Sequence, residues 1–261
     1  MPSAKKSYRK SSTSKLTALV DGDIYIFKAA AVVEKAVNWG GDLWTLHANL
    51  SDAQEIIEEK LESIKTETGA DKLIVALSDI TNFRYSVYPL YKSNRKDKRP
   101  PLLREVLKQW MLETYETFLR PGLEADDVLG ILGTSTVIVK GKKIVVSEDK
   151  DLKTIPGRLY NTRSKEFTEV SEADADRQHM IQTLTGDASD GYPGCPGVGE
   201  VGAERLLKDV TGQDLWPTVV KAYEKAGLTE QDALIQAQIA RICRKEDYDF
   251  KKKEVILWKP Q

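Results

Sequence analysis

The sequence predicts an α/β fold: a mostly parallel, twisted sheet flanked by helices, followed by a mostly helical C-terminal part. Two observations lead to this prediction. From residue 16 to about residue 180, short apolar runs typical of buried strands alternate with segments whose apolar residues recur at helical spacing. Beyond Thr185, a Gly- and Pro-rich loop introduces amphipathic segments. We therefore expect an α/β core at residues 16–180 and a helical module at residues 181–261.

Local patterns predict each element in turn. Buried strands are expected where short apolar runs occur, at 16–20, 72–77 and 143–147, and a short β excursion at 159–170. A helix is expected from about Ser51 to Gly69, because glycine commonly ends helices. Further helices are expected over 102–118, in LEADDVLGILG (123–133), from Ser171 with Asp174 as its capping partner, from Val201, and over 214–245.

Composition limits the class of protein. Hydrophobic residues make up 41% of the 261 positions, enough for a core, and no apolar run is long enough to span a membrane. The start of the chain resembles no secretory signal, and Cys195 and Cys243 offer no disulfide framework, so we expect a cytoplasmic protein. Residues 1–15 are rich in Ser and Lys and predict a disordered basic tail.

The net charge of −1 conceals a separation of charge along the chain. Lys and Arg concentrate at 5–15, 92–108 and 241–253. Local basic stretches of this kind permit nucleic-acid binding even when the whole chain is nearly neutral. With only two histidines, far apart in sequence, a zinc site has few ligands available.

Acidic residues gather where strands end and helices begin. Asp21, Asp79 and Asp149 each follow an apolar run, and the carboxyl ends of parallel strands meet in one crevice. Carboxylates held close together repel unless they share protons or bind cations, so the pattern favours Mg²⁺ or Mn²⁺. Any single acid could instead be an ordinary cap or solvated turn. The candidate metal ligands are Asp21, Asp79, Glu124, Asp126, Asp127, Asp149, Asp151, Asp187 and Asp190.

Such a site would suit phosphodiester hydrolysis. Two cations bridged by carboxylates can activate a water and stabilise the leaving oxygen of an in-line displacement. The sequence offers no plausible Ser-His-Asp arrangement and no Walker-type phosphate loop.

Two further segments could bind phosphate. The glycine-rich stretch 193–203 permits tight turns before a helix, where exposed N–H groups bind phosphate oxygens; a plain interhelical turn is the alternative. Its GVGEVG also fits a dinucleotide fingerprint, but it follows no strand. The basic stretch 91–108 could neutralise phosphates or form a solvated helix face; its candidate DNA-binding residues are Tyr91, Lys92, Arg95, Lys96 and Arg99.

Taken together, these motifs resemble the 5′-nuclease superfamily, which includes flap endonucleases, the 5′-nuclease domain of DNA polymerase I and bacteriophage 5′–3′ exonucleases. The resemblance covers roughly residues 16–207, and the stand-alone exonucleases of T7-like phages are the most similar in type. It is borne by five ordered motifs: VDGD, SD…FR…YKSNR, EADD, SEDKDL and GDASDGYPGCPGVGEVGA.

The resemblance implies roles for individual residues. A first metal would be held by Asp21, Asp79, Glu124 and Asp126, and a second by Asp127, Asp149, Asp151, Asp187 and Asp190. Asp21 and Asp126 would be catalytic through the metals, and Lys92 and Arg95 would steer and polarise the scissile phosphodiester beside Tyr91. Residues 91–118 would form a helical arch. A helix-three-turn-helix module would grip duplex backbone, with a bound K⁺, through Gly197, Val198, Gly199 and Gly202.

The expected function is that of a monomeric, metal-dependent, structure-specific 5′–3′ exonuclease or flap endonuclease. Its expected substrates are DNA duplex ends, nicks, 5′ flaps and RNA–DNA hybrids. A PIN-type ribonuclease and a non-catalytic protein that binds DNA junctions are the alternatives. The sequence departs from the family pattern in the two prolines of the short arch, Pro100 and Pro101, and in an additional acid, Asp23, to which the pattern gives no role.

Overall fold

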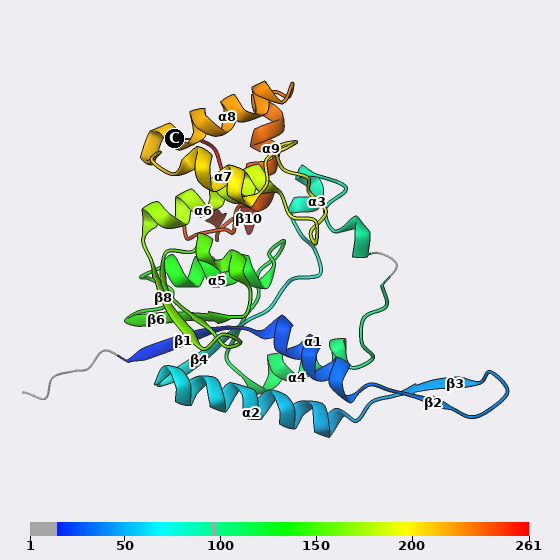
Figure 1. The fold of residues 1–261 in the computed structure, drawn as a ribbon. Helices are drawn as coiled ribbons and strands as arrows, with labels where there is room; N and C mark the ends of the chain where they lie inside the picture. The colour runs from blue at the N-terminus through cyan, green and yellow to red at the C-terminus, as the bar shows by residue number, and fades with distance from the viewer. Residues whose placement is uncertain (1–14, 96–97, 261) are drawn as a thin grey trace, which may run out of the picture.

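The computed structural model describes residues 15–95 and 98–260 (Figure 1). The predicted basic tail lies, apart from Lys15, outside the described residues, and so does Lys96. A central sheet separates one layer of helices from a second layer, above which the C-terminal helices are stacked (Figure 1).

The central sheet confirms the predicted α/β architecture. Its strand order is β5-β4-β1-β6-β7-β8, and only the β7–β8 pair is antiparallel. The three predicted strands are β1, β4 and β6, and the predicted β excursion is the β7–β8 hairpin. The bounds are β1 Leu16–Asp21, β4 Lys72–Ala76, β5 Thr117–Phe118, β6 Lys142–Ser147, β7 Gly157–Asn161 and β8 Glu166–Val170.

Alternate residues of the central strand face opposite layers. Ala18 and Val20 of β1 pack against one layer, and Leu19 packs against the other. The first layer holds α1 (Gly22–Val33), α2 (Leu50–Thr68) and α4 (Arg104–Thr114); the second holds α5 (Ala125–Thr134). Because β1 is buried on both faces, its apolar run is continuous, as expected for a central parallel strand.

Two predicted helices end earlier than the sequence suggested. The helix expected over 102–118 is α4, which stops at Thr114 because the following residues join the sheet: the Val75 amide donates to Glu116 O at 2.9 Å, and Thr117 pairs with Val75 in β5. The helix expected to reach residue 245 ends at Ala240. The chain beyond it returns to the core, where β9 (Tyr248–Asp249) and β10 (Glu254–Val255) form a small hairpin.

Some elements were not predicted. Helix α1 starts directly after Asp21, and short helices occur at α3 (Arg84–Val87), η1 (Ser93–Arg95) and η2 (Lys150–Thr154). A hairpin of β2 (Lys35–Asn38) and β3 (Trp44–His47) projects from the body (Figure 1). Its tryptophans, Trp39 and Trp44, are exposed, so the hairpin lacks the apolar burial that makes strands easy to recognise.

The C-terminal helices share a second core. Met180, Leu184 and Tyr223 are buried together with residues of four helices: α6 (Glu172–Thr185), α7 (Glu200–Leu207), α8 (Leu215–Lys225) and α9 (Glu230–Ala240), with the short η3 (Gly212–Asp214) before α8. The predicted boundary at 180/181 falls inside α6, which therefore contributes to both parts. No helix in residues 15–95 and 98–260 is both long and apolar enough to cross a membrane.

Gly130 of α5 is the point at which the returning C-terminal segment touches the core. A Cβ atom there would collide with the Cys243 carbonyl oxygen and lie 3.0 Å from Ile242 Cγ2. We expect Gly130→Ala to cost about 1–3 kcal/mol of stability in a urea unfolding experiment, as overpacked sites do. Gly202→Ala is the control: this helical glycine has only Val198 Cγ1 at 3.7 Å, so alanine should be neutral or stabilising by up to about 1 kcal/mol. Equal effects of the two substitutions would contradict the close packing at Gly130.

Candidate functional site

A cleft of about 620 Å³ lies between the second helical layer and the C-terminal helices. Its walls come from segments far apart in sequence: the start of α5, the turn after β6, the loop after α6 and the end of α9. Six of the nine predicted metal ligands line it: Glu124, Asp126, Asp149, Asp151, Asp187 and Asp190.

Asp21 lies beside this cleft, buried at the end of β1. Its carboxylate caps α1 by accepting from the Ile24 amide at 3.3 Å, and it accepts from Ser147 Oγ at 3.2 Å. Burial, together with the negative charges of Asp23 and then Asp149, raises the pKa of Asp21 from 3.8 to about 7. The strand end therefore holds a carboxylate whose charge is poorly compensated.

The neighbouring acids share this condition. Burial and the charges of Asp21 and Asp149 raise the pKa of Asp126 well above its usual range. Burial and the charges of Asp149 and Asp187 raise the pKa of Asp151 to about 6. The ends of β1 and β6 and the start of α5 therefore lie close enough for their acids to repel one another, whereas Asp79, the third acid expected at this edge, is not among them.

The donor chemistry of this cluster fits divalent cations. Carboxylate oxygens are the ligands that Mg²⁺ and Mn²⁺ prefer, and a bound cation would remove the repulsion that raises these pKa values. Among the residues that the structure describes, no three carboxylate, imidazole or thiol side chains converge closely enough to hold a metal ion as they stand.

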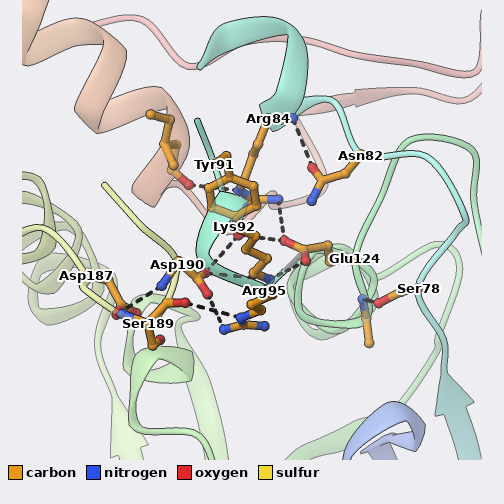
Figure 2. A network of polar contacts seen from close by, with 12 residues as sticks. Ser78, Asn82, Arg84, Tyr91, Lys92, Arg95, Glu124, Asp187, Ser189 and Asp190 are labelled. Carbon is orange, nitrogen blue, oxygen red and sulfur yellow. Dashed lines mark hydrogen bonds and ion pairs between the residues drawn. The ribbon is translucent and has the colours of Figure 1, made fainter. Parts of the chain in front are cut away.

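Basic and aromatic side chains contact two of the cleft acids, Glu124 and Asp190 (Figure 2). The Lys92 ammonium pairs with Glu124 and lies 3.6 Å from Asp190, and Arg95 donates to Asp190 Oδ1 at 2.6 Å. The buried Tyr91 hydroxyl lies 2.8 Å from an oxygen of each of these acids. Burial opposes ionisation of Glu124, but the charges of Lys92 and Arg84 lower its pKa to about 2. The cleft thus has one side where basic side chains offset the charge of the acids, and another where the acids have no such ion pairs.

Backbone contacts hold the basic segment against the loop after α6. The Lys92 amide donates to Asp190 O at 2.7 Å, and Asn94 Nδ2 donates to Ala188 O at 3.0 Å. Lys92 adopts a left-handed conformation with φ 52°, which is uncommon for lysine and costs on the order of 1 kcal/mol or more. Such strain persists where surrounding contacts impose it.

Two glycines shape the loop that carries Asp187 and Asp190. Gly186 and Gly194 have φ of 65° and 67°, and a Cβ on either would strike the backbone of the other strand of the loop. Asp187 pairs with Tyr192 between them, with N···O distances of 2.9 and 3.1 Å. The GDASDGYPG sequence therefore closes a narrow loop whose acids point toward the cleft.

Asp127, predicted as a metal ligand, is not among the residues that line the cleft. It is fully buried, and its oxygens accept from Arg84 Nη1 at 2.7 Å, Arg84 Nη2 at 2.8 Å, the Cys243 amide at 3.0 Å and the Glu124 amide at 3.1 Å. These four donors fill the acceptor capacity of a carboxylate. Arg84 lies in the quoted FR motif, yet its role was missed, because a buried arginine has no distinctive spacing in sequence.

Asp79 is also placed apart from the cleft. Its carboxylate accepts from the Gly122 amide at 2.9 Å and from the Thr81 hydroxyl, and although burial opposes it, these bonds lower its pKa. It thus closes the turn before α5. Asp23, which had no expected role, accepts from the Ser78 amide at 3.1 Å and so holds the end of β4 beside α1.

The remaining predicted DNA-binding residues lie outside the cleft or at its rim. Arg99 pairs with Glu34, the residue that ends α1, and so faces away from the acids. Gly197 has φ 77° and Gly199 caps α7, as the predicted turn requires. Glu200, the first residue of α7, lines the cleft, which places the Gly197–Gly202 segment at its rim. Gln178 and Gln182 of α6 also line the cleft and were not predicted.

Comparison with known proteins assigns the family. A family model described as "5'-3' exonuclease, N-terminal resolvase-like domain" matches residues 16–181. The chain belongs to this 5′–3′ exonuclease family. It is 31% identical to an exodeoxyribonuclease of Enterobacteria phage T3, over 93% of this chain and 92% of the relative, and 31% identical to an exonuclease of Escherichia phage T7, over 93% of both. The predicted resemblance to the 5′-nuclease superfamily is confirmed.

Two solved structures have folds similar to that of this chain. A flap endonuclease of bacteriophage T5, in complex with DNA and metal ions, superposes with a TM-score of 0.61 at 15% identity, covering 87% of this chain and 89% of the other. A T5 protein co-crystallised with metal ions gives a TM-score of 0.58 at 15% identity, covering 87% and 93%. At this identity the likeness confirms the fold.

The Tyr91 hydroxyl should stabilise the fold through the acids that it bridges. Tyr91→Phe removes the donor shared by Glu124 and Asp190, and hydrogen bonds to charged groups contribute about 1.5–3 kcal/mol. We expect a loss of this size in urea unfolding. Tyr85→Phe, an exposed neighbour in the same segment, is the control and should change stability by less than about 0.5 kcal/mol. Equal stability of the two variants would mean that the bridge contributes nothing.

Proposed function

We propose that this protein is a metal-dependent 5′–3′ exodeoxyribonuclease that hydrolyses DNA phosphodiesters with two divalent cations, Mg²⁺ or Mn²⁺. The observation that supports it most is that Asp126, Asp149, Asp151 and Asp187 line one cleft together with Lys92 and Arg95, with Asp21 buried beside it. The family match over residues 16–181 makes hydrolysis of nucleic acid the expected use of such a site.

The proposed ligands are the acids around the cleft. Asp21, Asp126, Asp149, Asp151 and Asp187 would hold the cations, with Glu124 and Asp190 beside them; Asp79 and Asp127 would support the site from outside. Bound cations would lower the pKa of a water and offset charge on the phosphodiester. The chain's own contribution is to place these carboxylates on strand ends and helix starts around one cleft, from which their side chains would turn toward the cations.

Lys92 and Arg95 would orient the scissile phosphodiester. Both pair with acids of the cleft in the structure, so their charges already stand where a phosphate would arrive. Once bound cations offset the charges of Glu124 and Asp190, Lys92 and Arg95 would be free to turn to the phosphate. They would bind it by charge-assisted hydrogen bonds. Tyr91 would keep the segment in place.

Duplex DNA would extend from the cleft onto the C-terminal helices. The turn at Gly197, Val198 and Gly199 leads into α7 with no side chain capping its first amides, which leaves N–H groups for backbone phosphates; Gly202 permits close approach. We also propose a K⁺ at this turn, action as a monomer in the cytoplasm, and the division into core and helical module. Of the arch expected at 91–118, residues 104–114 instead form α4 of the first helical layer and residues 117–118 form β5 of the sheet.

Among the possible substrates we favour 5′ ends of duplex DNA. The phage relatives named exodeoxyribonuclease and exonuclease match over nearly their full length. Curated relatives named flap endonuclease also match, for example one of Shewanella woodyi, at 31% identity over 52% of this chain and 58% of the relative. Nicks, 5′ flaps and RNA–DNA hybrids are therefore further proposed substrates.

The carboxylate cluster should be indispensable for cleavage but not for folding. Asp126→Asn and Asp151→Asn should each lower kcat by about 10²-fold or more, and EDTA should abolish cleavage by the wild type. Because burial and neighbouring acids raise the pKa of both carboxyls, their charged forms destabilise the fold, and neutral amides should leave the melting temperature in EDTA unchanged or higher.

The matched control for these variants is Asp42→Asn, which changes an exposed aspartate in the β2–β3 turn and should retain wild-type activity. Full activity of either cleft variant, or wild-type cleavage in EDTA, would refute the two-metal proposal.

The products from 5′-labelled DNA should identify the reaction. With Mg²⁺, blunt and nicked duplexes should release labelled mononucleotides. Release of a short oligonucleotide from flapped duplexes alone would instead indicate a flap endonuclease. Cleavage of RNA but not DNA duplexes would indicate a PIN-type ribonuclease, and junction binding without cleavage would indicate a non-catalytic protein.

A further inference from the structure

Arg84 lines the cleft but is almost fully buried, with every N–H group engaged. Nε donates to Ile239 O at 2.8 Å, and Nη2 donates to Arg241 O at 2.7 Å and to Asp127 Oδ1. Nη1 donates to Asp127 Oδ2 and lies 3.3 Å from Glu124 Oε2. A guanidinium has five N–H donors, so none remains for a ligand.

These bonds join three segments that form the cleft. Arg84 starts α3, Glu124 caps α5, and Ile239 and Arg241 stand at the end of α9 (Figure 2 shows Arg84 beside Glu124). Asp127 completes the joint, because it also accepts from the Cys243 amide just after α9 and from the amide of Glu124. The pair therefore connects the C-terminal helices to the first turn of α5, which also carries Asp126.

We propose that Arg84 is a positioning residue for the cleavage reaction, and that Asp127 acts with it as one unit rather than as a metal ligand. The inference rests on the proposed nuclease function. Arg84 fixes the direction of the Glu124 carboxylate and the position of the first turn of α5 at the cleft, while its own N–H groups all bond within the protein.

The geometry requires arginine at this position. Lysine keeps the positive charge but offers a single point donor, so it cannot bind both oxygens of Asp127 and also reach two backbone carbonyls. A residue that merely supplied charge to a phosphate would tolerate this exchange. Arg84→Lys therefore separates positioning from charge.

The test compares steady-state cleavage of a 5′-labelled duplex at saturating Mg²⁺ by the full chain and its variants. Arg84→Lys should lower kcat by about 10²-fold, as small displacements of reacting groups do, with KM for DNA within about threefold of wild type. Asp127→Asn should do the same. The double variant should be no slower than the slower single variant, since residues that act as a unit are not additive. Arg158→Lys, an exposed arginine on β7, is the matched control and should be unchanged.

Several outcomes would overturn the proposal. A wild-type kcat in Arg84→Lys would show that cleavage does not require the bidentate contact between Arg84 and Asp127. An effect on KM alone, with the salt dependence of DNA binding lowered by about one charge, would make Arg84 a phosphate contact. Multiplying effects in the double variant, with a raised Mg²⁺ requirement in Asp127→Asn, would make Asp127 an independent metal ligand. Loss of folding in both single variants would mean that the ion pair of Arg84 and Asp127 only stabilises the core. Failure of the proposed function is distinguishable, because the wild-type protein itself would then not cleave DNA.

Discussion

The constraint on which the structure depends is charge balance at the carboxyl edge of a parallel sheet. The parallel order of β1 and β6 brings Asp21 and Asp149 to one edge, and α5 adds Asp126. Burial, and then their mutual repulsion, raise the pKa values of Asp21 and Asp126, so ionising this edge costs folding free energy. The fold tolerates the cost because extensive apolar burial on both faces of β1 offsets it. Charge that a fold retains at a cost indicates a functional site.

The same edge has two electrostatic halves. Glu124 and Asp190 pair with Lys92 and Arg95 and accept from the Tyr91 hydroxyl. Asp21, Asp126 and Asp151 are instead buried, and each is repelled by Asp149. The compensated half lies where the C-terminal loop meets the core. The ion pairs there join chain segments, and the uncompensated half remains available for cations. Structural and chemical roles are thus divided among acids that look alike in sequence.

Sequence patterns predicted the parts of this site that depend on periodicity. Buried strands and the acids that follow them were identified, because apolar runs and their ends are local signals. The roles of Asp79 and Asp127 could not be separated from those of Asp126, because adjacent residues of one helix turn can face opposite directions. Asp127 turns inward to a buried Arg84, and this partner lies 43 residues away. The early ends of α4 and α9 were missed for a similar reason, since the residues after each helix bond to distant partners: Glu116 to Val75, and Arg241 to Arg84.

The contacts that connect chain segments around the cleft share one chemical feature. Side chains from one segment donate to backbone carbonyls of another: Arg84 to Ile239 and Arg241, and Asn94 to Ala188 and Ser189. A carbonyl is present whatever residue occupies the position, so the accepting segments can change sequence freely while the donors cannot. The constraint falls on a few donors and on glycines such as Gly186 and Gly194, whose backbones must pass in direct contact.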